Sequence, residues 1–277
     1  MVRPNELTLR AAANAAVATI APARGGLVTQ FELGGRPVLF MDQGTLDDPR
    51  QNVRGGIPVL FPSPGKLVGD AWTYGGRQGS MKQHGFARNH EWQVIEASSA
   101  AATLRLVAND QTRAQYPWDF ALSQTITVSD RSLRLEHEIT NRSDTPMPFG
   151  FGFHPYFFVP EDRKRETSIT TRATRAFDNV SKQIIELTNI DLTRQEVDLH
   201  LIDHGSTTGE LCSPLGTVQL IGSPEYTHWV VWTLAGRDFV CLEPWTCPAN
   251  ALNDGDRLSL LAPGTSQSMA LEILATR

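Results

Sequence analysis

The chain has 277 residues, of which 40% are hydrophobic and 20% are charged, and this ordinary globular mixture excludes a disordered chain. The net charge of −5 argues against nucleic acid as the main partner, because binding to a phosphate backbone needs a basic face. No apolar stretch reaches the roughly 18 residues of a membrane span. A chain of this length buries a large core unaided, so we expect one domain over residues 1–277.

The first pattern along the chain is an alanine-rich run at residues 11–23 that ends in A-P-A, as some secretory signals do. Asn14 interrupts this run, Glu6 precedes it, and the strand-like sequence V-T-Q-F-E-L-G-G follows at 28–35. These features favour a strand over a cleaved leader. We therefore expect a cytoplasmic protein.

Proline and glycine concentrate between residues 54 and 88, which predicts long loops over one face of the fold. In R-G-G-I-P-V-L-F-P-S-P-G-K at 54–66, the two glycines after Arg54 allow a sharp bend and a close approach to a ligand. Taken alone, the segment also fits an exposed turn with a solvated arginine.

The segment K-Q-H-G-F-A-R at 82–88 gathers several polar side chains around one glycine. The forked guanidinium of Arg88 suits a phosphate or a pair of hydroxyls, and the amide of Gln83 both donates and accepts hydrogen bonds. His84 is a further binding candidate in the same segment. By composition alone, a basic surface loop is an equally good interpretation.

Short runs in which apolar and polar residues alternate dominate the rest of the chain, and helical periodicity is weak throughout. Such runs, separated by Gly, Pro, Asp and Ser turns, predict an all-β fold, a large antiparallel β-sandwich. Residues 182–201 fit neither pattern well and leave room for a short helical turn. The expected strands include 103–108, 122–128, 132–139, 217–221, 228–234 and 269–274.

Two apolar segments each carry one ionisable residue. His154 lies among five aromatic residues and a proline in F-G-F-H-P-Y-F-F-V at 151–159, and Glu243 lies in V-C-L-E-P-W-T-C at 240–247. Burial lowers the pKa of a histidine and raises that of a glutamate, which brings both toward the range useful for proton transfer. The alternative interpretations are a core histidine with a satisfied hydrogen bond and a structural glutamate paired with an arginine. Trp245 offers an apolar face to a sugar ring.

The cysteines are three in number, without a Cys-x-x-Cys motif, which indicates neither a disulfide framework nor a zinc site. A reducing compartment fits this pattern. The histidines His84, His90 and His154 also lack the spacing of metal ligands, so we expect no metal.

Together these segments resemble the aldose 1-epimerase (galactose mutarotase-like) superfamily, and most closely its hexose-6-phosphate mutarotase branch. The resemblance runs in order from R-G-G-I-P at 54–58 through Q-H-G-F-A-R at 83–88 and F-H-P-Y-F at 153–157 to L-E-P-W-T at 242–246. It implies that family's antiparallel β-sandwich, a small-molecule sugar or sugar phosphate as partner, and no cofactor.

The resemblance also implies roles for individual residues. His154 matches the general acid that acts on the ring oxygen, and Glu243 matches the general base that acts on the anomeric hydroxyl. Arg54, Gln83 and Arg88 match substrate-contacting positions.

The family's substrate-binding aspartate lies in an E-x-D segment, which E-V-D at 196–198 resembles. That gives Asp198, with Asp191 and Asp203 as alternatives. The segment E-P-W-T-C-P-A-N-A-L-N resembles free-aldose enzymes as much as sugar-phosphate enzymes, so a free-aldose substrate stays open.

The implied reaction opens the sugar ring by general acid–base catalysis, rotates the C1–C2 bond and closes the ring on the other face. We expect the acid and the base on opposite sides of the reaction centre, and Arg54, Arg88 and Lys82 around the 6-phosphate. Two alternatives are a noncatalytic carbohydrate-binding domain, which needs no acid–base pair, and a glycoside hydrolase, which needs two carboxylates. The sequence does not predict the oligomeric state.

Overall fold

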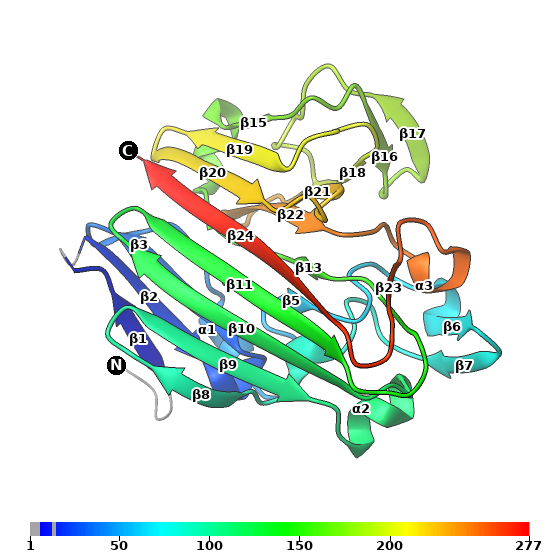
Figure 1. Ribbon diagram of the computed structural model, residues 1–277. Coiled ribbons are helices and arrows are strands. Elements are labelled where there is room, and N and C mark those ends of the chain that lie inside the picture. Colours follow the sequence, from blue (N-terminus) through cyan, green and yellow to red (C-terminus); the bar gives the residue numbers. More distant parts are fainter. Residues whose placement is uncertain (1–5, 13–14, 277) are drawn as a thin grey trace.

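The computed structural model describes residues 6–12 and 15–276, and antiparallel strands dominate it (Figure 1). The long strands β9, β10, β11 and β24 lie side by side across the view in Figure 1. They belong to an eight-stranded sheet. In order across this sheet, the strands are β15 (Ser168–Thr170), β19 (Thr208–Ser213), β20 (Gly216–Gly222), β24 (Ser266–Thr276), β11 (Ser132–Asn141), β10 (Phe120–Ser129), β9 (Ala101–Val107) and β8 (Gln93–Ala97).

A second eight-stranded sheet carries Glu243 and Asp198, and His154 lies between two of its strands, β13 (Gly152–Phe153) and β14 (Tyr156–Phe158). Strand β14 pairs with β22 outside the main order. The main order is β17 (Gln183–Glu186), β16 (Arg175–Asp178), β18 (Glu196–Leu201), β21 (His228–Leu234), β22 (Phe239–Trp245), β13 (Gly152–Phe153) and β5 (Val59–Leu60).

Smaller elements flank the two sheets. Three small sheets comprise β1 (Leu7–Arg10), β2 (Ala16–Ala21), β3 (Leu27–Leu33) and β4 (Arg36–Pro37), then β6 (Ala71–Tyr74) with β7 (Arg77–Ser80), and β12 (Met147–Phe149) with β23 (Ser259–Leu261). The short α-helices are α1 (Gln43–Asp47), α2 (Asp110–Gln115) and α3 (Ala251–Asp254), and the 3₁₀ turns are η1 (Pro22–Arg24), η2 (Val68–Asp70), η3 (Ala87–Asn89) and η4 (Glu161–Glu166).

The sheets pack on each other through the period of two that the sequence shows. Leu133, Leu135 and Ile139 of β11 alternate with exposed or half-buried residues and join one continuous core cluster with Val197 and Leu199 of β18. Side chains on alternate positions of a strand point to opposite faces, so one face of each sheet fills the core. The other face of β18 and its neighbours is left free to line a cavity.

The all-β prediction is confirmed, and the run at 228–234 is strand β21. The helical turn within residues 182–201 is wrong, because that stretch holds strands β17 and β18. E-V-D-L-H-L alternates strictly, with its three apolar residues buried. Asn14 of the alanine-rich run lies outside the described residues, while β2 begins at Ala16.

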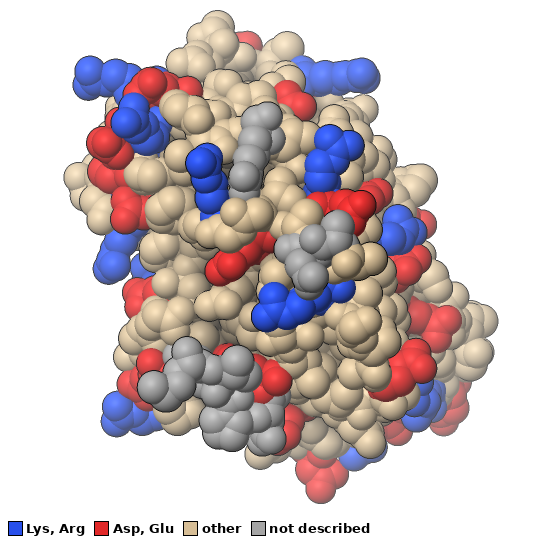
Figure 2. Space-filling model, turned by 90° about the vertical axis from the view of Figure 1, so that its left-hand side faces the viewer, with Lys and Arg blue, Asp and Glu red and all other residues tan. Residues whose placement is uncertain are grey.

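Charge is spread rather than gathered on the face shown in Figure 2. Basic and acidic side chains are interspersed on the face shown in Figure 2, as expected for a chain with a small net negative charge. Among the described residues, no helix is long and apolar enough to cross a bilayer.

Candidate active site

A cavity of about 810 Å³ opens on the free face of the second large sheet. Three neighbouring strands supply its floor, because every second side chain of each strand points to this face. The residues that they contribute are Glu196, Asp198 and His200 of β18, His228, Val230 and Trp232 of β21, and Glu243 and Trp245 of β22.

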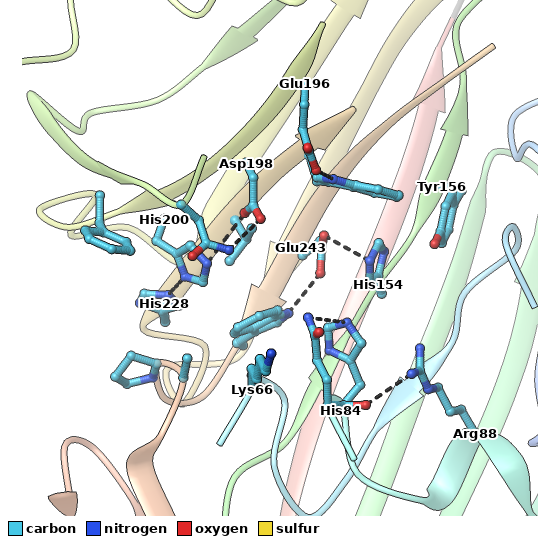
Figure 3. A pocket seen from close by; sticks show the side chains of 18 of the residues that line it. Lys66, His84, Arg88, His154, Tyr156, Glu196, Asp198, His200, His228 and Glu243 are labelled. Carbon is cyan, nitrogen blue, oxygen red and sulfur yellow. Dashed lines mark hydrogen bonds and ion pairs between the residues drawn. The ribbon is translucent and has the colours of Figure 1, made fainter. Parts of the chain in front are cut away.

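His154 and Glu243 are in direct contact at the centre of this cavity (Figure 3). Nε2 of His154 lies 3.3 Å from Oε1 of Glu243, and the two side chains are 8% and 2% exposed. His154 follows β13, its backbone N–H donates to the Pro58 carbonyl at 3.1 Å, and its ring stacks on Tyr156 with a centroid separation of 4.6 Å. Both side chains are therefore held in place before any ligand binds.

The second carboxylate oxygen of Glu243 also has a partner. The indole N–H of Trp245 donates to Oε2 at 3.2 Å. The sequence analysis gave Trp245 only an apolar role and missed this hydrogen bond, although residues 243 and 245 of one strand necessarily share a face. With one oxygen on His154 and the other on Trp245, the plane of the carboxylate is fixed.

Burial sets the proton affinities of the pair in opposite directions. Desolvation raises the pKa of Glu243 well above its usual value, and the charge of Asp198 adds to this effect, whereas the Trp245 hydrogen bond and Arg88 oppose it. Desolvation lowers the pKa of His154 well below its usual value, and the electrostatic effects of the neighbouring His84 and Arg88 side chains act in the same direction. A buried pair of this kind avoids a net charge of either sign, so it holds one proton between the two residues near neutrality.

The expectation that acid and base flank the reaction centre from opposite sides differs from the structure, which places them side by side. The reason is chemical: the anomeric hydroxyl and the ring oxygen are both bonded to C1. An acid for one oxygen and a base for the other must therefore lie next to each other.

The segment at 82–88 curls against the pair. His84 has a backbone φ of 73°, and its ring lies edge-on to that of His154 with a centroid separation of 5.4 Å. Its Nδ1–H donates to the Pro64 carbonyl, while Nε2 lies 3.3 Å from the amide nitrogen of Gln83. Burial lowers the pKa of His84 to about 3, so this imidazole is neutral and Nε2 is an acceptor.

Gly85 makes this arrangement possible, because it has a φ of 69° and a Cβ there would lie 2.1 Å from the carbonyl oxygen of Phe61. We expect Gly85→Ala to destabilise the protein by more than about 2 kcal/mol, through both the left-handed backbone and the clash. Gly75→Ala is the matched control, because Gly75 has a φ of 56° but open space around it. Thermal unfolding checks this prediction, and equal losses of Tm for the two variants would contradict it.

Arg54 and Arg88 both line the cavity, and Arg88 lies on the side of the pair that belongs to His154 (Figure 3). Arg88 donates from Nη2 to the carbonyl of Gln83 at 3.1 Å, but its buried Nε has no partner among the described residues. Arg54 is exposed and forms no ion pair with any described carboxylate. Both guanidinium groups are thus free to bind an anion.

Two expectations about these loops are wrong. Lys82 is not in the cavity lining and pairs instead with Asp70 at 3.2 Å. The glycines after Arg54 approach the protein's own backbone rather than a ligand, because a Cβ on Gly56 would lie 2.2 Å from the carbonyl oxygen of Val28.

The structure separates the three candidate aspartates. Asp198 lines the cavity, its Oδ2 accepts a hydrogen bond from Asn179 at 2.7 Å, and burial raises its pKa. Asp191 accepts from Thr193, and Asp203 accepts from the backbone of residues 174 and 175. Neither of these two lines the cavity.

A model of the family described as aldose 1-epimerase matches residues 7–273. The chain belongs to the aldose 1-epimerase family. It is thus an isomerase that acts on a sugar, and the noncatalytic alternative falls away.

Three relatives are each similar to half or more of this epimerase family member. Protein LacX of Lactococcus lactis subsp. lactis is 25% identical over an alignment of 266 positions that covers 84% of this chain and 89% of LacX. A "Putative glucose-6-phosphate 1-epimerase" of Cenchrus ciliaris is 28% identical over 150 residues, half of this chain and 42% of that protein. The crystal structure of the Slr1438 protein from Synechocystis sp. PCC 6803 superposes with a TM-score of 0.95 at 36% identity, covering 99% of this chain and 96% of the other.

The sequence analysis of this epimerase missed several cavity residues. His200 lies in the stretch 182–201, for which a helical turn was considered, His228 begins the predicted strand at 228–234, and Lys66 and Arg257 lie in loops. Alternation could have found His200, which is two residues after Asp198 and so shares its face. His228 opens β21, and no local signal marks it.

The donor atoms of one group of residues are close enough to hold a metal ion. Among the described residues, the ligand atoms of His154, Cys241 and Glu243 lie within 4.8 Å of one another. This group contains both members of the predicted acid–base pair, His154 and Glu243. That the enzyme works without a metal stays a prediction.

Proposed function

We propose that this epimerase interconverts the α and β anomers of a hexose 6-phosphate, glucose 6-phosphate in the first place. The observation that carries the proposal is that Arg54 and Arg88 line the same cavity as His154, while Arg54 has no ion pair and Nε of Arg88 no partner among the described residues. The ring oxygen O5 is bonded to C5, which bears C6, so a sugar with O5 at His154 directs its C6 substituent toward these arginines. Two guanidinium groups suit a phosphate dianion. Curated relatives named as glucose-6-phosphate 1-epimerases support the same substrate.

The chemistry follows from the shared proton. Glu243 as carboxylate takes the proton of the anomeric hydroxyl, and protonated His154 gives a proton to O5, which breaks the bond from C1 to O5. The pair is then left as a carboxylic acid and a neutral imidazole. Burial makes this uncharged state the resting state of the pair, so the shared proton first passes from Glu243 to His154 across their contact of 3.3 Å, and ring opening restores the uncharged state. Closure on the other face of the aldehyde reverses both transfers.

The remaining polar groups of the cavity orient the sugar. Asp198 accepts hydrogen bonds from hydroxyl groups, and the neutral His84 and the amide of Gln83 complete the set. We further propose a cytoplasmic location, which suits the three cysteines Cys212, Cys241 and Cys247, all of them free.

Arg88→Ala tests the phosphate assignment. We expect its KM for glucose 6-phosphate to rise about 10- to 100-fold, the effect of losing a charged hydrogen bond, with little change for glucose. Lys82→Ala is the matched control, because it removes an exposed cation of the same segment that pairs with Asp70 outside the cavity. A coupled anomerase assay with glucose 6-phosphate, glucose and galactose provides the readout. Equal losses by Arg88→Ala on phosphorylated and free sugar would favour the free-aldose alternative.

A further inference from the structure

A row of four side chains, which are Arg257, His228, His200 and Asp198, runs along the cavity wall from its rim inward (Figure 3 shows its inner part). Nη2 of Arg257 lies 3.5 Å from Nδ1 of His228, and Nε2 of His228 lies 2.9 Å from Nδ1 of His200. Nε2 of His200 then lies 3.6 Å from Oδ1 of Asp198. The mechanism above uses neither histidine.

Arg257, at the outer end of this row, determines which nitrogen of each imidazole ring carries the proton. A guanidinium group only donates hydrogen bonds, so Nδ1 of His228 must accept. A neutral His228 therefore carries its proton on Nε2 and donates it to Nδ1 of His200. A neutral His200 must then carry its own proton on Nε2, which faces Asp198.

The imidazole rings of His200 and His228 are both neutral at physiological pH. Burial lowers the pKa of His200 to about 4 and that of His228 well below its usual value. Arg257 is itself held in place, since Nη1 donates to the Thr227 carbonyl at 3.0 Å and Nε to Asp256 at 3.2 Å. Arg257 therefore fixes the direction in which the hydrogen bonds of this row are donated, from Arg257 inward.

At the inner end of the row, His200 and Asp198 lie close together but are not hydrogen-bonded to each other. A separation of 3.6 Å between Nε2 of His200 and Oδ1 of Asp198 is too long for a hydrogen bond. Oδ2 of Asp198 already accepts from Asn179, whereas Oδ1 accepts no hydrogen bond within the described residues. A donor and an acceptor therefore stand side by side, and a hydroxyl group, which accepts and donates at once, satisfies both.

We propose that His200 binds substrate together with Asp198, and that the two hold the C2 hydroxyl of the sugar between an N–H donor and a carboxylate acceptor. His228 and Arg257 are positioning residues that fix the tautomer of His200. The choice of C2 rests on the proposed function: Glu243 serves the hydroxyl on C1, and Asp198 and His200 lie on the side of Glu243 away from His154 and Arg88 (Figure 3). The ring neighbour of C1 on the side away from O5 is C2.

The tautomers can be read without any substrate. In ¹⁵N-labelled protein at pH 7, we expect the imidazole resonances of His200 and His228 to show a protonated Nε2 and an unprotonated Nδ1. His228→Gln should preserve the His200 tautomer, because its amide N–H can replace the donor, whereas His228→Leu should release it. A protonated Nδ1 on His200 in the wild-type protein would overturn the proposal whatever the enzyme's substrate is.

Kinetics test the specificity. His200→Leu should lower kcat/KM for glucose 6-phosphate about 10- to 100-fold, the effect of one lost hydrogen bond beside a carboxylate, and leave that for 2-deoxyglucose 6-phosphate nearly unchanged. His200→Gln, whose amide nitrogen reaches the place of Nε2, should recover part of the loss. If glucose proves the better substrate, 2-deoxyglucose is the comparison, so a failed phosphate assignment leaves this test intact. Equal losses on the sugar and its 2-deoxy analogue would overturn the role of His200.

Discussion

Glu243→Gln and His154→Asn are each expected to lower kcat by about 10²- to 10⁴-fold, the usual contribution of a positioned acid or base. Glu243→Gln keeps the size of the side chain and a hydrogen-bonding group at the contact of 3.3 Å, whereas the shorter side chain of His154→Asn does not reach the position of Nε2. Glutamine cannot take the proton of the anomeric hydroxyl, and asparagine cannot deliver one to the ring oxygen. Polarimetry on freshly dissolved α-anomer measures the change.

The double variant provides a sharper form of the same test. Because the two groups transfer their protons in one step, removing both should cost little more than removing either. Glu196→Gln is the matched control, since Glu196 lines the same cavity but accepts its hydrogen bond from Trp232 at 3.2 Å. Near-normal turnover by either single variant, or a loss of similar size in the control, would contradict the assignment.

Glu243→Gln is also expected to stabilise the protein at alkaline pH, although it abolishes turnover. The folded-state pKa of Glu243 is raised, so above about pH 4.5 the unfolded chain loses a proton that the folded protein keeps. The wild type therefore loses stability as pH rises from there, and the variant does not. His154 has the opposite sign: its lowered folded-state pKa costs the wild type stability as pH falls below about 6.5, where the unfolded chain gains a proton.

Thermal unfolding of wild type and Glu243→Gln between pH 4 and pH 8 measures this effect. The difference in Tm should grow with pH and reach several degrees at pH 8, as each 1 kcal/mol moves Tm by roughly 2–4 °C in a chain of this size. His154→Asn should show its gain at the acid end instead. A Glu243→Gln protein that is less stable than the wild type at pH 8 would mean that the carboxylate is chiefly structural.

The alternation of apolar and polar residues with a period of two predicted most of the strands of the fold. Strands β9, β10, β11, β20 and β24 lie where alternation predicts them, because their inward side chains fill one core, and β21 lies where the more continuous apolar run at 228–234 predicts a buried strand. Residues 182–201 failed as a prediction since β17 is mostly exposed and gives no clean alternation. Strand β18 in the same stretch alternates strictly and could have been recognised.

Individual ionisable residues of the site could be recognised from the sequence, but the contacts between them could not. An ionisable residue inside an apolar run marks both His154 and Glu243. Their direct contact depends on the pairing of Gly152 in β13 with Trp245 in β22, which no local pattern encodes. The contact between His200 and His228 likewise joins two residues that lie on different strands and are 28 positions apart in the sequence.

The proposed mechanism opens the sugar ring of the substrate at O5 and leaves the anomeric oxygen on C1. Glucose 6-phosphate labelled with ¹⁸O at the C1 hydroxyl tests it directly, by following anomer exchange and label loss together in one NMR experiment. The account predicts that the enzyme accelerates exchange between the anomers while the label is lost no faster than without enzyme. Loss of the label to water at the rate of anomer exchange would show that the bond from C1 to the anomeric oxygen breaks instead, and would contradict the assignment of Glu243 and His154.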